Sequence, residues 1–196
     1  MKAVTKVLNR RLWDAAVKVQ KFLASNQIDN CVIGGLAVNR WGDPRTTSDV
    51  DLTLIVPFGD EKATATTVLQ AFASRIEAPF EFAIRARILL VVDPDGVKLD
   101  LSLGGLPFEL RMLNRSSWWK VDGLEPVRTC SAEDLVITKA FASRPQDWID
   151  VERIVIRQKE RLDRSLILSE LEPLVSLKEE PEILERLKRL FRANSL

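Results

Sequence analysis

The chain has 196 residues, of which 46% are hydrophobic and 29% are charged, a composition that allows one sizeable globular core with at most a small helical appendage. Its 29 basic and 28 acidic residues leave a net charge of +1, so net charge gives no indication of a nucleic-acid partner. Histidine and tyrosine are absent, which excludes serine–histidine triads, cysteine–histidine nucleophiles, histidine-ligated zinc and tyrosine nucleophiles, and leaves carboxylates, Lys, Arg, Ser, Thr and bound metal.

Two cysteines, Cys31 and Cys130, lie far apart with no paired spacing, which favours buried thiols over a disulfide scaffold or a zinc site. The sequence has no apolar run of about 18 residues and no signal-peptide pattern. We therefore expect a cytoplasmic protein without a membrane partner.

The first half of the chain alternates helical and strand patterns. In chain order, we predict a helix over 5–25, a short strand before Gly34-Gly35, a strand over 50–56, a helix over 61–76 and a strand over 80–84. Residues 87–103 read as a hairpin, because Asp93-Pro94-Asp95-Gly96 is a strong turn signal between two β-rich runs.

The second half is mainly helical. A helix over 106–114 and short extended pieces up to residue 130 precede it. Ser131 and Asp134 have the spacing of a capping box, and Pro145 suits the first turn of the next helix. Residues 163–196 predict two more helices. The pattern thus indicates a mixed α/β part that changes to a helical part near residue 130.

Asp49 and Asp51 open the strand "DVDLTLIV" and share one of its faces, because strand side chains alternate. They lie roughly 6.6 Å apart along the strand. At that range two carboxylates repel by roughly 2–3 kcal/mol, which a divalent cation would relieve.

Asp100 lies on the second strand of the predicted hairpin. If that strand runs beside the one carrying Asp51, a third carboxylate joins the pair. Three carboxylates can hold two metal ions about 4 Å apart, one activating an attacking oxygen and one stabilising a leaving group. Gly34-Gly35, at the end of a strand and the start of a helix, would let backbone N–H groups approach a polyphosphate. Together these features indicate phosphoryl or nucleotidyl transfer.

The elements "VIGG", "SDVDL" and "KLDLS", in that order, resemble the nucleotidyltransferase superfamily typified by DNA polymerase beta. The segment "RTTSDVDL" resembles AbiEii-type and minimal nucleotidyltransferases, many of them toxins of toxin–antitoxin systems, and "SAEDLVITKAFASRPQDWIDVERI" is similar to the helix pair that follows in that group. The resemblance covers residues 28–155. It implies an α/β (α+β) fold, with a small mixed-sheet nucleotidyltransferase core over 1–130 and a C-terminal helical region over 131–196 packed on the core.

The resemblance also assigns roles to residues. It implies Asp49, Asp51 and Asp100 as catalytic ligands of two Mg²⁺ ions, with Mn²⁺ as a substitute, and Asp100 as the group that activates the acceptor hydroxyl. The triphosphate of the donor nucleotide, such as ATP or CTP, would contact further residues: Gly34, Gly35, Arg45, Ser48 and Lys139.

The acceptor stays open at this stage. An RNA (for example tRNA) or a protein fits a toxin with a cognate antitoxin, whereas an antibiotic-modifying enzyme fits the same core, and a catalytically silent nucleotide-binding module is a third alternative. Trp118-Trp119 could stack on a base and "RLKRLFR" could hold an RNA backbone, although core packing and a solvated helix face are the simpler interpretations. Asp147 and Asp150, at the start of a helix, are expected there for helix-dipole reasons alone.

Overall fold

The computed structural model describes residues 9–194. The chain divides into two compact units: one combines the described part of residues 1–37 with residues 45–130, and the other combines residues 38–44 with the chain from Ser131 onward. We call them the sheet unit and the helical unit. Within the described residues, no helix has both the length and the hydrophobicity needed to cross a membrane.

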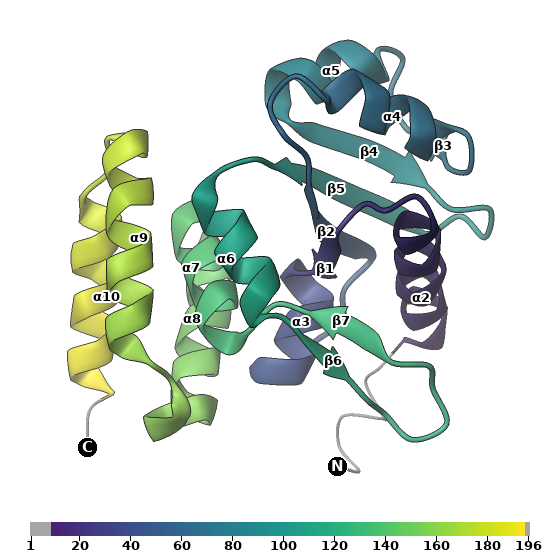
Figure 1. Ribbon diagram of the computed structural model, residues 1–196. Helices are drawn as coiled ribbons and strands as arrows, with labels where there is room; N and C mark the ends of the chain where they lie inside the picture. Colours follow the sequence, from purple (N-terminus) through teal and green to yellow (C-terminus); the bar gives the residue numbers. More distant parts are fainter. Residues whose placement is uncertain (1–8, 195–196) are drawn as a thin grey trace. The chain divides into compact units, whose positions relative to one another are not determined.

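The sheet unit contains short helices and a mixed β-sheet (Figure 1). Its elements, in chain order, are α2 (Arg10–Ser25), β1 (Asn30–Val32), the start of α3 (Gly34–Trp41), β2 (Asp49–Ile55), α4 (Glu61–Leu69), β3 (Ala73–Ser74), α5 (Pro79–Ala86), β4 (Ile88–Val92), β5 (Lys98–Gly104), α6 (Pro107–Arg115), β6 (Ser117–Trp119) and β7 (Val127–Thr129). The α/β fold class predicted from the sequence is confirmed.

The strands described form one sheet in the order β3-β4-β5-β2-β1-β7-β6. β2 runs parallel to β5 and β1 runs parallel to β7, whereas the other neighbours are antiparallel. The parallel β2–β5 pair is central, and its register places Asp51 directly opposite Asp100.

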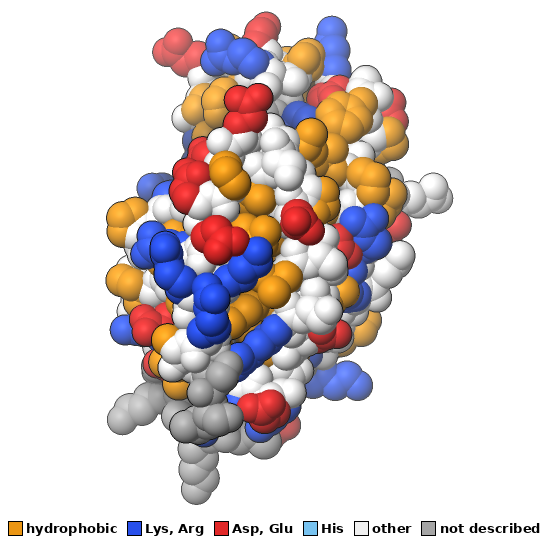
Figure 2. Space-filling model, turned by 90° about the vertical axis from the view of Figure 1, so that its left-hand side faces the viewer, with side chains coloured by type: hydrophobic (Ala, Val, Ile, Leu, Met, Phe, Trp, Pro, Cys, Tyr) orange, Lys and Arg blue, Asp and Glu red, His pale blue; other side chains and the backbone are white. Residues whose placement is uncertain are grey.

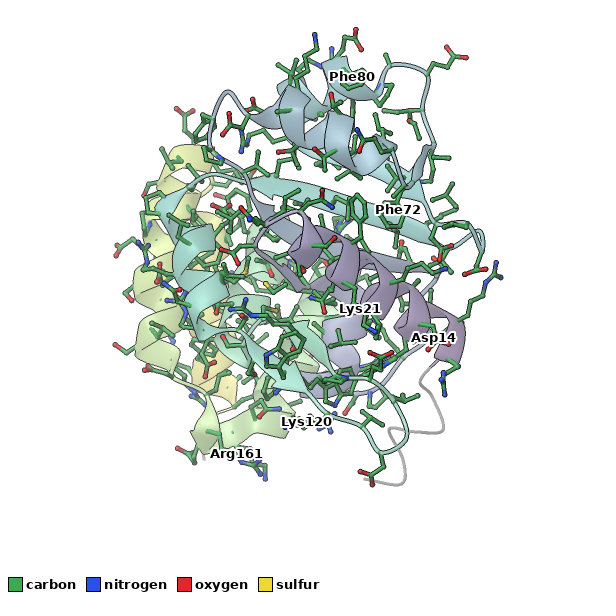
Figure 3. The ribbon with its side chains drawn as sticks, turned by 45° about the vertical axis from the view of Figure 1, so that its right-hand side comes forward. Asp14, Lys21, Phe72, Phe80, Lys120 and Arg161 are labelled. Carbon is green, nitrogen blue, oxygen red and sulfur yellow. The ribbon has the colours of Figure 1, made fainter. Side chains whose placement is uncertain are left out.

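One face of the central strands forms the hydrophobic core. Alternate residues of β2, β4 and β5 are fully buried there against apolar side chains of α2, α4 and α5. Trp13 of α2 stacks edge-on against Trp119, with ring centroids 4.9 Å apart. Figure 3 shows Asp14 and Lys21 on the outer side of α2, where both pair with other exposed side chains. Strand side chains alternate between the two faces, and Asp49, Asp51 and Asp100 lie between the buried residues of β2 and β5. Their side chains are therefore on the opposite face of the sheet.

The structure corrects the sequence analysis between residues 61 and 86. The helix predicted over 61–76 ends at Leu69, and the chain then forms β3. The strand predicted over 80–84 is helix α5, which has Pro79 in its first turn and buries Ala83. The alternating aromatic and polar residues suggested a strand, but Pro79 presets a helical φ and removes an N–H that a strand would need.

The hairpin and the caps are confirmed. β4 and β5 pair antiparallel around the turn at Asp93, whose Oδ1 accepts hydrogen bonds from the N–H groups of Asp95 (2.9 Å) and Val97 (2.7 Å). Ser131 caps α7 by accepting from the Asp134 N–H at 3.0 Å and donating to its carboxylate at 2.7 Å. Both turn and cap therefore follow from side chains that bond their own backbone.

The helical unit consists of paired helices. Its elements are α7 (Ala132–Ala142), α8 (Pro145–Gln158), η1 (Lys159–Arg161), α9 (Arg164–Lys178) and α10 (Glu182–Ala193). The segment 38–44 belongs here because Arg157 and Gln158 of α8 donate to the carbonyls of Gly42 and Trp41. Trp148 of α8 lies under the guanidinium of Arg186 of α10, 4.2 Å from the ring centroid.

Candidate active site

Three carboxylates share the face of the sheet opposite the core. Asp49 and Asp51 stand two residues apart on β2, and Asp100 faces Asp51 across the parallel pair, where neighbouring strands lie about 4.8 Å apart. All three side chains are half-buried. The structure thus brings together the three acidic residues predicted from the sequence.

The diglycine lies against Asp51. Gly34 has φ +60, and a Cβ there would lie 1.9 Å from Asp51 Oδ2. The Gly35 N–H donates to the same oxygen at 3.3 Å, and the Ile33 N–H donates to the Asp51 carbonyl at 2.9 Å. Only glycine has both the conformation and the space that position 34 requires.

Thr47 lies next to both the diglycine and Asp49, and the sequence analysis did not single it out. Its hydroxyl donates to Asp49 Oδ1 at 2.9 Å, and a Cβ on Gly35 would lie 2.5 Å from that hydroxyl oxygen. Thr47 therefore links the diglycine to Asp49. Its position two residues before Asp49, in a Ser/Thr-rich loop, is the signal that could have identified it.

Arg75 is a second residue that the sequence analysis missed. It follows β3, and its N–H donates to the Leu90 carbonyl at 3.0 Å, which sets it on the same sheet face as Leu90 and Asp100. Its guanidinium forms an ion pair with the Asp100 carboxylate. Because β3 was predicted as helix, nothing in the sequence placed Arg75 next to Asp100.

Carboxylates are the kind of ligand that Mg²⁺ prefers, one or two at a time and together with phosphate and water oxygens. As they stand, however, no three acidic or Cys side chains within residues 9–194 are arranged to hold a metal ion together. Each carboxylate has a partner of its own: Asp49 accepts from the Thr47 hydroxyl, Asp51 accepts from the Gly35 N–H, and Asp100 pairs with Arg75. The strand register sets the three carboxylates on one face of the sheet, and a shared metal site stays a prediction.

The remaining predicted phosphate contacts are placed as follows. Arg45 is half-buried in the loop before β2, where it donates to the Thr46 carbonyl at 3.2 Å, and Ser48 is exposed directly before Asp49. Both are close in sequence to the carboxylates. Their contact with a triphosphate stays a prediction.

Lys139 belongs to the helical unit. Its buried ammonium lies 2.8 Å from Asp147 and 2.9 Å from Asp150, and both carboxylates are buried too. Burial raises the pKa of Asp147, but hydrogen bonds and charge from Arg144 and Lys139 outweigh it and leave that pKa below its ordinary value. We call these three residues the buried ion cluster; the structure gives its lysine two counter-ions within its own unit.

A shallow groove adjoins the carboxylate row. It has a volume of about 510 Å³, and its lining is mostly apolar, consisting of Ile76, Ala78, Glu81, Phe82, Arg85 and Leu90. Leu90 is the cross-strand partner of Asp100, so the groove begins one strand away from that carboxylate.

Comparison with known proteins identifies the family. Residues 13–189 match the family described as nucleotidyl transferase of unknown function (DUF2204). The chain belongs to this family. The match spans both units and includes Gly34, Asp49, Asp51 and Asp100. No curated protein matches the chain.

Two solved structures are similar to this nucleotidyl transferase family member at low identity. One is an antigenic nucleotidyltransferase-like protein from Paracoccidioides brasiliensis, with 20% identity, 87% of this chain and 89% of that chain covered, and a TM-score of 0.48. The other is the antibiotic-resistance factor ANT(2'')-Ia, with 16% identity, 90% and 97% coverage, and a TM-score of 0.44. Since both TM-scores are below 0.5, neither likeness bears on the activity of this chain.

Proposed function

We propose that the protein is a metal-dependent nucleotidyltransferase that moves a nucleoside monophosphate from a nucleoside triphosphate to an acceptor hydroxyl. The observation that carries the proposal is the register of β2 and β5, which sets Asp51 opposite Asp100 with Asp49 on the same face. Membership of the nucleotidyl transferase family supports the same reaction class.

The proposed reaction uses the chain's own groups as follows. Asp49, Asp51 and Asp100 would hold two Mg²⁺ ions, for which Mn²⁺ could substitute. When bound, these ions neutralise the triphosphate and make the acceptor hydroxyl more acidic. Asp100 accepts the hydroxyl proton, the acceptor oxygen bonds to the α-phosphorus, and the bond from that phosphorus to the bridging oxygen breaks to release pyrophosphate. The lack of a side chain at Gly34 lets the Asp51 carboxylate lie directly against the backbone of the diglycine.

For the acceptor we propose an RNA, such as tRNA, or a protein, as in AbiEii-type and minimal nucleotidyltransferase toxins that act with an antitoxin. The groove beside Asp100 supports this choice. Its lining is mostly apolar and offers a single carboxylate, Glu81, next to the cationic Arg85. A polycationic aminosugar would need several carboxylates, whereas a nucleobase or an apolar side chain suits such a surface.

The test is incorporation of label from each of four α-³²P-labelled nucleoside triphosphates, with Mg²⁺, into total cellular RNA, a protein lysate and an aminoglycoside. We expect labelling of RNA or protein by the wild type. Asp49→Asn and Asp51→Asn should each lower it on the order of 100-fold or more, since metal ligation supplies several kcal/mol of transition-state stabilisation.

Asp14→Asn is the matched control, because it removes an exposed carboxylate of the same unit whose ion-pair partner among the described residues is Arg10. It should keep full activity, and circular dichroism should show all variants folded. Labelling of the aminoglycoside alone would identify an antibiotic-modifying enzyme instead. Absence of labelling together with calorimetric binding of the triphosphate would identify a silent binding module.

A further inference from the structure

The side chain of Arg75 reaches Asp100 along the surface of the sheet. Arg75, Leu90, Asp100 and Asp51 follow one another across β3's end, β4, β5 and β2 on the face opposite the core. The guanidinium passes Leu90 and pairs with Asp100 Oδ1. The side chains of Arg75 and Asp100 are 23% and 36% exposed, so water and ions have access to the pair.

Arg75 differs from a neighbouring arginine with a structural role. Arg87, in the same unit, donates from Nε to the Leu103 carbonyl at 2.7 Å and from Nη2 to the Val56 carbonyl at 2.5 Å, and it pairs with Glu61. Each part of its guanidinium is thus fixed. Among residues 9–194, the guanidinium of Arg75 pairs only with Asp100, and its buried Nε has no hydrogen-bond partner there. A buried unsatisfied donor is costly, so this arrangement is poorly suited to a permanent structural contact.

The ion pair also competes with a metal ion. A guanidinium and a divalent cation are both positive and need the same carboxylate oxygens of Asp100. Without a cation, Asp51 and Asp100 would face each other as like charges across about 4.8 Å, and the guanidinium relieves that repulsion. Arg75 can therefore stand in for the metal only while the metal is absent.

We propose that Arg75 is a displaceable counter-ion of Asp100: it holds the third carboxylate in the metal-free protein and is displaced when a divalent cation binds. Arg75 is a positioning residue in this scheme, because it acts through Asp100. The inference rests on the proposed function only in taking the three carboxylates as the metal site. It accounts for the pairing of Asp100 with the Arg75 guanidinium.

The test measures Mn²⁺ affinity of the full chain, without nucleotide, by calorimetry and by the loss of the free-Mn²⁺ electron paramagnetic resonance signal at 150 mM salt. Arg75→Gln should bind Mn²⁺ on the order of tenfold more tightly than the wild type. The reason is that the wild type must first break the half-buried ion pair, whose strength is expected to lie between those of exposed and buried pairs. Arg75→Lys, which keeps the charge but lacks the guanidinium fork, should be intermediate.

Arg85→Gln is the matched control. Arg85 is an exposed arginine of α5 that forms no ion pair with a carboxylate in the part of the chain that the structure describes. The variant loses the same charge from the same unit, so its Mn²⁺ affinity should differ from that of the wild type by less than twofold at this salt concentration. In an Asp100→Asn background, Arg75→Gln should change the affinity no more than Arg85→Gln does. Thermal unfolding checks that each variant is folded.

Unchanged or weaker Mn²⁺ binding by folded Arg75→Gln and Arg75→Lys would overturn the role of Arg75 and leave the proposed function intact. If neither the wild type nor any variant binds Mn²⁺, both this inference and the metal-dependent reaction are wrong. Tighter binding that persists in the Asp100→Asn background would show a general charge effect, and it too would overturn the inference.

Discussion

At the scale of single residues, Gly34 is the most constrained position of the candidate site. Gly34→Ala adds the strain of a left-handed φ and a Cβ that would lie 1.9 Å from Asp51 Oδ2. We expect a loss of about 2–4 kcal/mol in the free energy of unfolding, because strain and displacement of a half-buried carboxylate add together. Urea denaturation followed by circular dichroism measures it.

Gly123→Ala separates the cost of backbone strain from the cost of the contact with Asp51. Gly123 also has a positive φ, +75, but nothing lies within 4 Å of the position of its Cβ. Its replacement should cost only the backbone strain, about 1 kcal/mol. Equal losses for the two variants would show that the contact between Gly34 and Asp51 is unimportant to the fold.

Residue-level reasoning predicted the carboxylates and the diglycine, because strand alternation and glycine conformation are local properties. It could not find Arg75, whose relevance depends on β3 pairing with β4, a contact between chain segments about 17 residues apart. Lys139 shows the opposite case. The sequence pattern of a lysine in an apolar helix did not reveal its two buried counter-ions, which depend on the packing of α7 against α8. Its contact with a triphosphate stays a prediction.

At the scale of elements, the buried ion cluster joins α7 to α8. Lys139→Met leaves Asp147 and Asp150 buried without their shared cation. We expect a loss of about 3–5 kcal/mol in the free energy of unfolding, the usual effect of breaking a buried pair on one side. Lys188→Met, which removes a lysine paired with exposed Glu185, should change it by less than about 0.5 kcal/mol.

The same cluster predicts how stability depends on pH. The pKa of Asp147 is below its ordinary value of 3.8, so the unfolded chain binds the proton more readily than the folded one. Its contribution is complete above the unfolded pKa and is lost as the pH falls through the folded pKa. Asp147→Asn should therefore flatten the decline of the urea midpoint below about pH 4, and an unchanged decline would contradict the assignment.

Elements themselves were predictable where a local signal fixed them, as at the Ser131 cap and the Asp93 turn. They were not predictable at α5, where alternating aromatic and polar residues fit a strand as well as a short helix. The deciding interaction is tertiary: Ala83 packs into the core beneath β4, and its burial outweighs the local pattern.

At the scale of the whole molecule, the helical unit is built from two separate stretches of chain. Residues 38–44 supply the carbonyls that Arg157 and Gln158 bond, and Gly42 packs against Ile154. A fragment of residues 131–196 should therefore be less helical by circular dichroism and unfold at lower urea than a fragment in which residues 38–44 are joined to it by a Gly/Ser linker. Identical unfolding midpoints would show that these contacts contribute nothing.

Some basic side chains of α10 have contacts within the helical unit. Figure 2, the side on which Figure 1 draws α9 and α10, shows basic, acidic and hydrophobic side chains interspersed. On α10 itself, Lys188 pairs with Glu185 and Arg186 covers Trp148. The segment "RLKRLFR" thus has partners within the helical unit for part of its charge, and binding of an RNA backbone by this segment stays untested.

The tryptophan contacts give each unit its own optical label. With no tyrosine in the chain, ultraviolet emission comes almost wholly from five indoles: Trp13, Trp118 and Trp119 lie in the sheet unit, and Trp41 and Trp148 in the helical unit. Trp13 lies edge-on to Trp119, and Trp148 lies under the Arg186 guanidinium. Each contact is lost when the unit that contains it unfolds. Replacing the tryptophans of one unit by phenylalanine would therefore leave fluorescence that reports only on the unfolding of the other unit.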